Sequence, residues 1–294
     1  MTTVQQAITT LINRLNAAAR SGGPVPDRPR EARMLLAHAM GVPSQRLTLL
    51  GGDDLPNEVL QAALGLVDRR IKGEPVSHIL GRRNFFGREF FVDRRVLDPR
   101  PETEELVMAA LGQPFDRVLD LGTGSGAIIV TLLAERPGAH GYATDLSEQA
   151  LQVAEQNAQT HSVANRVQFQ RADWLAGIIG RFDLIVSNPP YIAATEMEGL
   201  QDEVRLYEPP MALTDGADGL TAYRTLIAGA PAHLSPGGRL IVEIGPTQAE
   251  PVRDMMEAAG LVAVDVLPDL DGRDRVVSGK MPQNLSTNSA KTPK

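Results

Sequence analysis

Short apolar runs alternate with helical segments after Pro101, and this alternation constrains the fold more than any other feature of the chain. Seven runs are predicted to be strands, at residues 117–121, 141–144, 167–170, 184–187, 239–244, 262–266 and 275–278. Helical patterns lie between the earlier runs, for example at residues 127–135 and 148–160. Almost continuously apolar strands that alternate with helices are typical of a parallel sheet covered on both faces. The sequence therefore predicts an α/β domain over residues 101–281.

Residues 1–73 are predicted to form a small, all-helical N-terminal domain. Apolar residues recur at helical spacing from Val4 to Leu15, in a helix expected to end at residues 21–24. Further helices are predicted at residues 27–40 and 57–72. The first 72 residues carry a net charge of +3 and the remainder −10, which gives weak support to a separate unit.

Residues 74–100 follow neither pattern. Four of the seven phenylalanines fall between Phe85 and Phe91, in a stretch rich in glycine and arginine. We predict a β-hairpin or irregular connector that packs between the two domains. Residues 282–294 are rich in Ser, Thr, Asn and Lys, and we expect a disordered tail there.

Composition excludes several classes of protein. The chain has no cysteine, so disulfides and thiolate chemistry are excluded, and its five histidines are too scattered to suggest a metal site. It has neither a run of about 18 uncharged apolar residues nor an N-terminal secretory signal, so we expect a cytoplasmic protein that does not bind a membrane. A net charge of −7 argues against nucleic acid as the main partner.

A glycine-rich loop follows the first predicted strand. The run Gly122-Thr123-Gly124-Ser125-Gly126 joins this strand to a helix, with glycines at alternate positions. Such glycines permit a tight turn and allow a ligand to approach backbone N–H groups at a helix N-terminus. The spacing differs from the G-x-G-x-x-G of dinucleotide sites, and by itself the loop fits either a tight turn or a ligand site.

The next two predicted strands also end in polar residues. Asp145 lies 19 residues after Gly126, where a carboxylate can accept hydrogen bonds from ribose hydroxyls. It can equally serve as the N-cap of the helix that begins at residue 148. Asp173 can accept a hydrogen bond from an adenine amino group, with Trp174 either beside the ring or in the core. Together, the three strand ends predict a nucleoside-binding crevice at the carboxyl edge of the sheet.

The fourth predicted strand runs directly into Asn188-Pro189-Pro190-Tyr191. Two consecutive prolines make a stiff loop because they fix φ and remove two backbone donors. Such a loop can present the Asn188 side-chain oxygen and the Pro189 carbonyl as convergent acceptors, with Tyr191 as an aromatic wall. These acceptors suit a planar NH2 group, either an amide or an exocyclic amine. Because a nucleoside-binding crevice is predicted beside this loop, a loop that binds an NH2 group is favoured over a simple Asn-capped turn.

With these motifs the chain resembles the class I S-adenosylmethionine-dependent methyltransferases, and within them the protein-(glutamine-N5) methyltransferases. Further segments of that family recur here: residues 74–81 with Phe85, residues 97–104 (Leu-Asp-Pro-Arg-Pro-Glu-Thr-Glu), Arg205 and Tyr207–Pro209 with Leu213, residues 243–245 with Gln248, and Asp269-Leu270 with residues 272–275. The Pro-Arg-Pro-Glu-Thr-Glu segment favours the branch that acts on peptide chain release factors over the one that acts on a ribosomal protein. The resemblance implies a Rossmann-like, mostly parallel seven-stranded sheet with helices on both faces.

The resemblance also implies site residues and an activity. Gly122, Thr123, Gly124, Ser125 and Gly126 would line the methionyl end of S-adenosylmethionine, Asp145 the ribose, and Asp173 with Trp174 the adenine. Asn188, Pro189, Pro190 and Tyr191 would hold the glutamine of the release factor's Gly-Gly-Gln motif, with Asn188 also touching the cofactor and Arg100 and Glu102 nearby. The implied reaction is methylation of that glutamine amide nitrogen, which modulates translation termination. We expect the enzyme to be a monomer.

Two other classes of function remain open from the sequence. A DNA or RNA methyltransferase uses the same tetrapeptide on an exocyclic amine, but it must flip its base and bind phosphates, and the predicted catalytic domain is acidic. A module that binds cofactor or release factor without chemistry is the other alternative. The intact glycine loop and intact tetrapeptide favour an enzyme.

Overall fold

The computed structural model describes residues 2–18 and 27–283, and these residues divide into two compact units. One unit contains the chain up to Arg82 together with Gly199–Glu208, and the other contains Arg83–Glu198 and the chain from Pro209 onward. The predicted end of the first helix at residues 21–24 and the predicted tail from residue 284 lie outside the described residues. No helix in the described ranges is long and apolar enough to cross a membrane.

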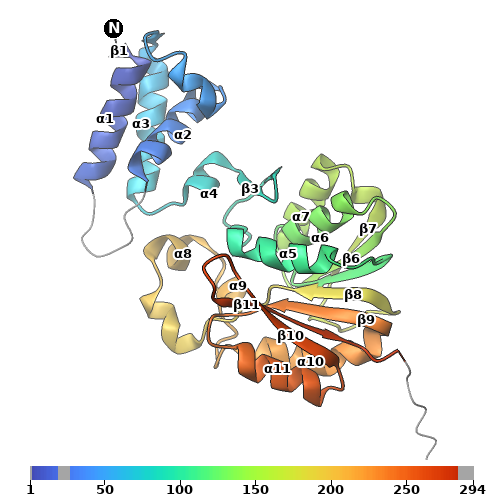
Figure 1. Ribbon diagram of the computed structural model, residues 1–294. Coiled ribbons are helices and arrows are strands. Elements are labelled where there is room, and N and C mark those ends of the chain that lie inside the picture. Colours follow the sequence, from blue (N-terminus) through green and yellow to red (C-terminus); the bar gives the residue numbers. More distant parts are fainter. Residues whose placement is uncertain (1, 19–26, 284–294) are drawn as a thin grey trace, which may run out of the picture. The chain divides into compact units, whose positions relative to one another are not determined.

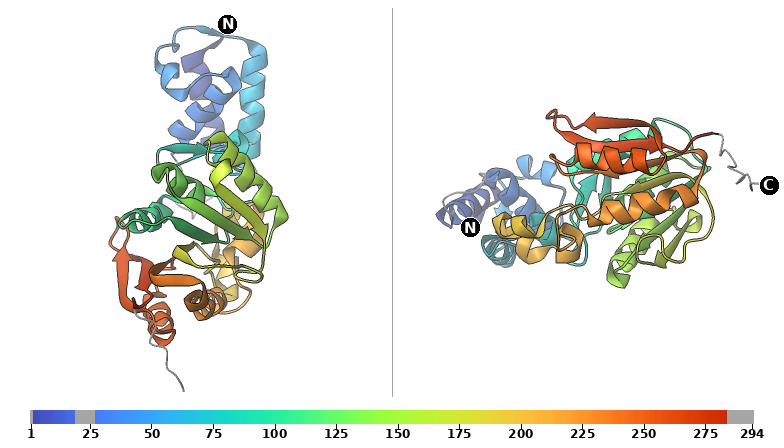
Figure 2. Two further views of the ribbon diagram at one scale, coloured as in Figure 1. Left: turned by 90° about the vertical axis from the view of Figure 1, so that its right-hand side faces the viewer. Right: turned by 90° about the horizontal axis from the view of Figure 1, so that it is seen from below.

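The first unit is built on three helices that lie side by side, α1 (Val4–Ala17), α2 (Arg28–Met40) and α3 (Asn57–Ile71) (Figures 1 and 2). Its core consists of the apolar stripes expected from the sequence, with Leu11 and Leu15 fully buried. A 3-10 turn (Ser44–Thr48) and a two-residue strand pair, β1 (Thr2–Thr3) with β2 (Asp54–Leu55), complete the bundle. The strand pair is an addition to the predicted all-helical domain.

Two further helices join this unit from other parts of the chain. Helix α4 (Val76–Leu80) forms within the segment that was predicted to be a hairpin connector; Gly81 ends it in a left-handed conformation. Helix α8 (Asp202–Tyr207) comes from far along the sequence, and its Glu203 binds Arg70 at 2.7 Å. Arg70 also binds Glu31 of α2, so one partly buried guanidinium links three helices.

The second unit contains a seven-stranded sheet in the order β10-β11-β9-β8-β5-β6-β7. Its strands are β5 (Arg117–Leu121), β6 (His140–Asp145), β7 (Val167–Arg171), β8 (Phe182–Ser187), β9 (Leu234–Glu243), β10 (Val262–Pro268) and β11 (Asp274–Lys280). Only β11 pairs antiparallel with its neighbours β9 and β10, whereas the other pairs are parallel. The predicted seven-stranded, mostly parallel sheet is thus confirmed.

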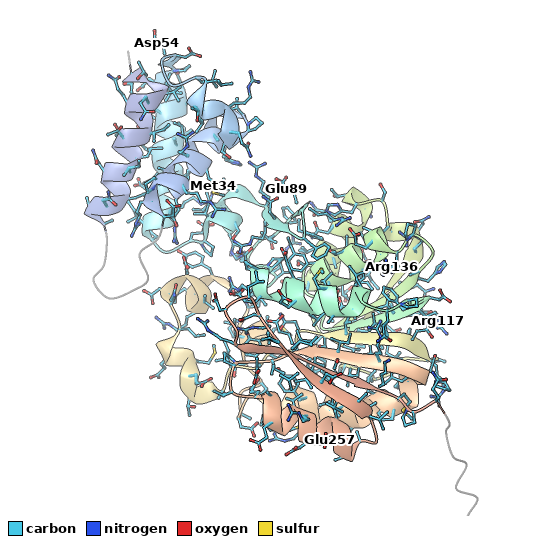
Figure 3. All side chains as sticks on the ribbon, viewed as in Figure 1. Met34, Asp54, Glu89, Arg117, Arg136 and Glu257 are labelled. Carbon is cyan, nitrogen blue, oxygen red and sulfur yellow. The ribbon has the colours of Figure 1, made fainter. Side chains whose placement is uncertain are left out.

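Helices cover both faces of the sheet (Figure 1). Helices α5 (Glu104–Leu111), α6 (Ala127–Glu135) and α7 (Glu148–Thr160) pack on one face, and α10 (Thr221–His233) and α11 (Ala249–Ala258) on the other. Neighbouring strand residues alternate between the two cores; for example, Val118 faces α6 and Leu119 faces α10. On α11, Val252 and Met256 are buried while Glu257 points to solvent (Figure 3).

Residues 83–100 pack against this second unit. Strands β3 (Arg83–Phe85) and β4 (Arg88–Phe90) form an antiparallel hairpin, whose turn residues Phe86 and Gly87 have positive φ. Phe85 and Phe90 are buried in the same core as α5 and α6. A 3-10 turn (Pro101–Thr103) then leads into α5. The remaining short helices are 3-10 turns at Ala164–Arg166 and Ala194–Gly199, and α9 (Pro210–Leu213).

Candidate active site

A cavity of about 320 Å³ lies at the carboxyl edge of the sheet. The strand order reverses between β5 and β8, which is where open α/β sheets bind their ligands. Ten of the predicted site residues line the cavity: Arg100, Gly122, Thr123, Gly124, Ser125, Asp145, Asp173, Trp174, Asn188 and Pro190. Four do not: Glu102, Gly126, Pro189 and Tyr191.

The glycine loop takes up the tight turn that its sequence suggests. Gly122, Gly124 and Gly126 all have positive φ, between +54° and +78°. The N–H groups of Gly122 and Thr123 both donate to the Thr144 carbonyl at 2.9 Å, so the loop is tied to the end of β6. A Cβ at Gly122 would lie 3.4 Å from the Trp174 ring, which therefore packs directly on the loop.

Asp145 holds two loops with its carboxylate. One oxygen accepts from the Gly124 N–H and the other from the Ser147 N–H, both at 2.9 Å. Burial raises the pKa of this carboxyl. The alternative role that the sequence left open, N-cap of the following helix, is wrong because Ser147 caps α7 with its hydroxyl to Ala150 N–H. Each Asp145 oxygen retains a lone pair with which to accept a further donor from the cavity.

Asp120, in β5 behind the glycine loop, is fully buried. Its Oδ2 accepts from the Thr123 hydroxyl at 2.7 Å, and Oδ1 has no hydrogen-bond partner among the described residues. Burial raises the pKa of Asp120 to about 7.

Trp174 lies between the core and the cavity. It packs against the apolar core around α10, and it also lines the cavity beside Asp173. Its backbone is in the left-handed region, with φ of 52°, which is uncommon for a bulky residue. Asp173 is exposed at the rim.

The loop Asn188–Tyr191 continues from β8 into the cavity wall. Asn188 Nδ2 donates to Thr103 Oγ1 at 3.2 Å, and this is the only hydrogen bond of the Asn188 side chain within residues 2–18 and 27–283. Its carbonyl oxygen is therefore available as an acceptor. Burial raises the pKa of Tyr191 to about 12, so this phenol stays neutral at ordinary pH.

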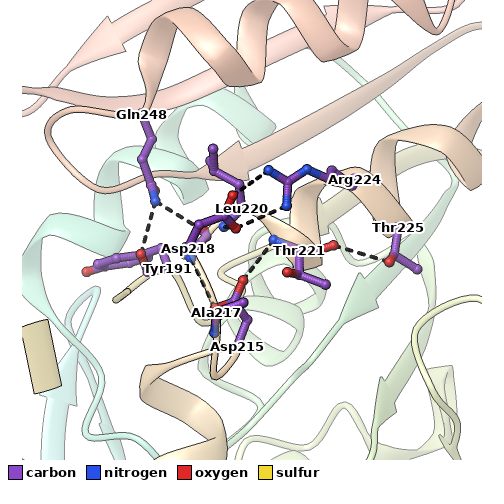
Figure 4. A network of polar contacts seen from close by, with 10 residues as sticks. Tyr191, Asp215, Ala217, Asp218, Leu220, Thr221, Arg224, Thr225 and Gln248 are labelled. Carbon is purple, nitrogen blue, oxygen red and sulfur yellow. Dashed lines mark hydrogen bonds and ion pairs between the residues drawn. The ribbon is translucent and has the colours of Figure 1, made fainter. Parts of the chain in front are cut away.

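A polar network fixes the end of this loop (Figure 4). Gln248 Nε2 donates to the carbonyls of Tyr191 at 3.0 Å and Gly219 at 3.1 Å, and its Oε1 accepts from Gly245 N–H at 3.0 Å. Asp215 accepts from the backbone N–H groups of the 217–221 turn at 2.8–3.0 Å. The turn and the tetrapeptide loop are thereby joined through their backbones.

Residues 95–103 form a further part of the cavity wall. The periodicity of the sequence did not predict this. Arg83 reaches from β3 to buried Asp98 at 3.5 Å and to the Pro99 carbonyl at 3.0 Å, which anchors the segment that carries Arg100. Arg100 lies at the cavity, whereas Glu102 is exposed and outside it.

The sequence analysis also missed residues on the opposite wall. Met211, Thr214, Asp215 and Thr221 line the cavity. The Asp215-Gly216-Ala217-Asp218-Gly219 run, with two glycines and two turn-forming aspartates, was a signal for a structured loop at this point. No group of three or more His, Cys, Asp or Glu side chains in the described ranges is arranged to hold a metal ion.

Comparisons with known proteins agree with this architecture. Residues 101–203 match the family model of the Methyltransferase small domain, and residues 6–81 match that of the PrmC N-terminal domain. The crystal structure of a methyltransferase from Pyrococcus furiosus shares the fold, with a TM-score of 0.53 and 17% identity over 73% of this chain and 97% of that one. The fold and the site define a class I methyltransferase.

Full-length relatives narrow the class to a family. The release factor glutamine methyltransferase of Cereibacter sphaeroides is 54% identical over 276 residues, which cover 94% of this chain and 98% of that protein. The protein of the same name from Neisseria gonorrhoeae is 45% identical over 260 residues, covering 87% and 94%. The chain belongs to the family of release factor glutamine methyltransferases.

Proposed function

We propose that this enzyme transfers a methyl group from S-adenosylmethionine to the side-chain amide nitrogen of the glutamine in the Gly-Gly-Gln motif of peptide chain release factors. The observation that carries the proposal is the position of Asn188. Its amide lines the cavity beside the glycine loop and has an uncommitted carbonyl oxygen. A hydrogen-bond acceptor at this point suits a substrate NH2 group.

The residues around the cavity fit the proposed cofactor. Gly124 leaves the loop open, since a Cβ there would meet nothing within 4 Å. Asp145 lines the cavity and would accept hydrogen bonds from the ribose hydroxyls with its remaining lone pairs. The cavity of about 320 Å³ lies within the range usual for small-molecule sites. S-adenosylmethionine would supply an electrophilic methyl group on a sulfonium. Thr123, Ser125, Asp173 and Trp174 would complete its binding site, with Gly126 ending the loop.

The tetrapeptide loop would hold and orient the glutamine amide. An amide nitrogen is a poor nucleophile because its lone pair is delocalised into the carbonyl. Asn188 Oδ1 and the Pro189 carbonyl would accept its two N–H groups, raising electron density on nitrogen and directing the lone pair at the methyl group. Pro190 and Tyr191 would enclose the side chain, and Arg100 and Glu102 would lie near its entrance. Such positioning contributes up to ~7–11 kcal/mol when fully realised.

The first unit would recognise the body of the release factor. A loop that presents one glutamine offers little surface, so specificity requires a second contact, and residues 6–81 match a domain model of their own. In this proposal the partner is a release factor and not nucleic acid or membrane, the enzyme is a cytoplasmic monomer, and its product modulates translation termination.

Mass spectrometry of a purified release factor tests the reaction and the substrate together. After incubation with enzyme and S-adenosylmethionine, we expect a gain of one methyl group on the Gly-Gly-Gln peptide. Asn188→Ala should lower turnover by roughly 10²-fold because it removes one preorganised polar group, with a smaller effect on cofactor affinity. An unmodified peptide with cofactor still bound would refute the proposed substrate.

A further inference from the structure

The turn between β10 and β11 carries an exposed leucine at its tip. Leu270 is 97% exposed, more than any other large apolar side chain in residues 2–18 and 27–283. The Asp269 carbonyl accepts from the Gly272 N–H at 2.9 Å, so Leu270 and Asp271 are the two central residues of a β-turn. A polar residue at either position would serve such a turn equally well, so Leu270 contributes nothing to the fold that explains its apolar side chain.

A buried ion pair holds this turn in one conformation. Asp269 Oδ1 accepts from the N–H groups of Asp271 and Arg273, both at 3.0 Å, and Oδ2 accepts from Arg275 Nη2 at 3.0 Å. The side chains of Asp269 and Arg275 are only 5% and 8% exposed. Arg275 also donates to the carbonyl of Ile244, just beyond the end of β9, at 3.3 Å. Because hydrogen bonds weaken steeply with distance and angle, these contacts fix the backbone that carries the exposed leucine.

The turn lies at the same edge of the sheet as the tetrapeptide loop. Strand β11 runs antiparallel to β9, and its Val276 pairs with Glu243, the last residue of β9. The turn that precedes β11 therefore projects from the carboxyl ends of β8 and β9, the ends to which the arrows of these strands point in Figure 1. Next to Ile244, a Cβ on Gly245 would lie 3.3 Å from the Tyr191 ring. The ion pair that anchors the turn is thus only a residue away from a contact of the tetrapeptide loop.

We propose that Leu270 is a docking contact for the release factor, on which an apolar side chain of the domain that carries the Gly-Gly-Gln loop packs. Leu270 does not line the cavity, so a glutamine bound there would leave it uncovered, and only a part of the substrate outside the cavity can reach it. Because the turn is already fixed, covering the side chain costs little conformational entropy. The inference rests on the proposed function, and it adds a contact on the second unit to the one proposed for the first.

Two substitutions of Leu270 test the inference on the full-length enzyme with a purified release factor. Leu270→Ser removes the apolar surface and should raise both KM for the release factor and the Kd of the complex, measured by calorimetry, by roughly 10-fold. Its kcat should stay within about 2-fold of wild type, because the contact is made equally in the ground state and the transition state. Leu270→Met keeps an apolar side chain of similar volume and should leave KM and Kd within about 3-fold of wild type.

Ile179→Ser is the matched control, because it removes a similar apolar surface from the opposite edge of the same sheet. Ile179 is 86% exposed and precedes Gly180, where a Cβ would lie 3.2 Å from the Arg117 guanidinium. Arg117 is the first residue of β5, so this loop lies at the amino edge. Ile179→Ser should leave KM and Kd for the release factor within about 2-fold of wild type, since side chains outside an interface do not contribute to binding. Affinity for S-adenosylmethionine should be unchanged in all variants.

The outcomes distinguish the inference from the proposed function. A wild-type enzyme that does not methylate the release factor overturns both. An active wild type with normal KM and Kd in Leu270→Ser overturns the inference alone. The inference is also overturned by a loss of kcat at unchanged KM in Leu270→Ser, by an equal loss of affinity in Leu270→Met, or by a loss that Ile179→Ser reproduces.

Discussion

Gly219→Ala should damage catalysis from outside the cavity, by displacing the tetrapeptide loop. Gly219 has a φ of +78°, and a Cβ built on it would overlap the Tyr191 carbonyl oxygen. To reach ordinary van der Waals distance, the methyl group and that carbonyl must separate by about 1 Å. The same methyl would lie 3.1 Å from Gln248 Nε2, which holds Tyr191 in place. A displacement of about 1 Å in a reacting group can cost 10²-fold in rate, or about 2.7 kcal/mol in activation free energy.

Gly216→Ala, in the same turn, is the matched control. Gly216 has nearly the same φ, +73°, but a Cβ there would meet nothing within 4 Å. Both substitutions should lower the free energy of unfolding by about 1–2 kcal/mol through left-handed strain. Only Gly219→Ala should lower kcat for methyl transfer, by roughly 10²-fold, measured by mass spectrometry at saturating substrate and cofactor. Equal losses of kcat in the two variants, or normal kcat in Gly219→Ala, would refute this reasoning.

Three further predictions concern the cofactor site and stability. Asp145→Asn should weaken S-adenosylmethionine binding by roughly 10²-fold, because it removes charge-assisted acceptors at the ribose position; unchanged affinity in calorimetry would contradict the proposed site. The pKa of Asp120 is raised from 3.8 to about 7 in the fold, so the native state keeps a proton that the unfolded chain releases, and stability falls as pH rises across this window. Asp120→Asn should therefore be more stable than wild type at pH 8, by at most about 4 kcal/mol, with an advantage that shrinks toward pH 5 in denaturant titrations. Arg70→Met should lower the free energy of unfolding by roughly 2–3 kcal/mol because it leaves the partly buried carboxylate of Glu31 without its cation, and Glu31→Gln in the same chain should recover part of the loss.

The sheet and its flanking helices could be predicted from sequence because each is a local pattern. Strand β5 and helices α6 and α7 begin and end where the sequence predicted, since an apolar run, a glycine turn and an amphipathic helix are all readable within a few residues. The ends of β6, β7 and β8 differ by two residues or fewer at each side. Because the ends of these strands were predicted, the positions of the site residues that follow them could be predicted as well.

The remaining features depend on contacts between distant parts of the chain. Helix α8 belongs to the first unit through Arg70 and Glu203, which are 133 residues apart. Thr103 and Asn188 are 85 residues apart, and no periodicity connects them. Helix α7 is capped by Ser147, whereas Asp145, the cap that the sequence suggested, accepts from the N–H of Gly124, which lies 21 residues away in the chain.

The walls of the cavity are held together mainly by single polar side chains that bind two backbone segments at once. Asn157, fully buried in α7, accepts from Phe91 N–H at 2.8 Å and donates to the carbonyls of Phe91 at 3.0 Å and Ser125 at 2.9 Å. It thereby links residues 91–100 to the glycine loop, as Asp145 links that loop to α7 and Gln248 links the tetrapeptide to its neighbours. Apolar contacts tolerate small shifts, whereas a hydrogen bond weakens steeply with distance and angle, so these links fix loop positions more sharply than packing does. In a sequence, an asparagine on one face of a helix is indistinguishable from a solvated surface residue. Positions of this kind should therefore affect turnover without touching ligand, and they are identified only when both of their backbone partners are known.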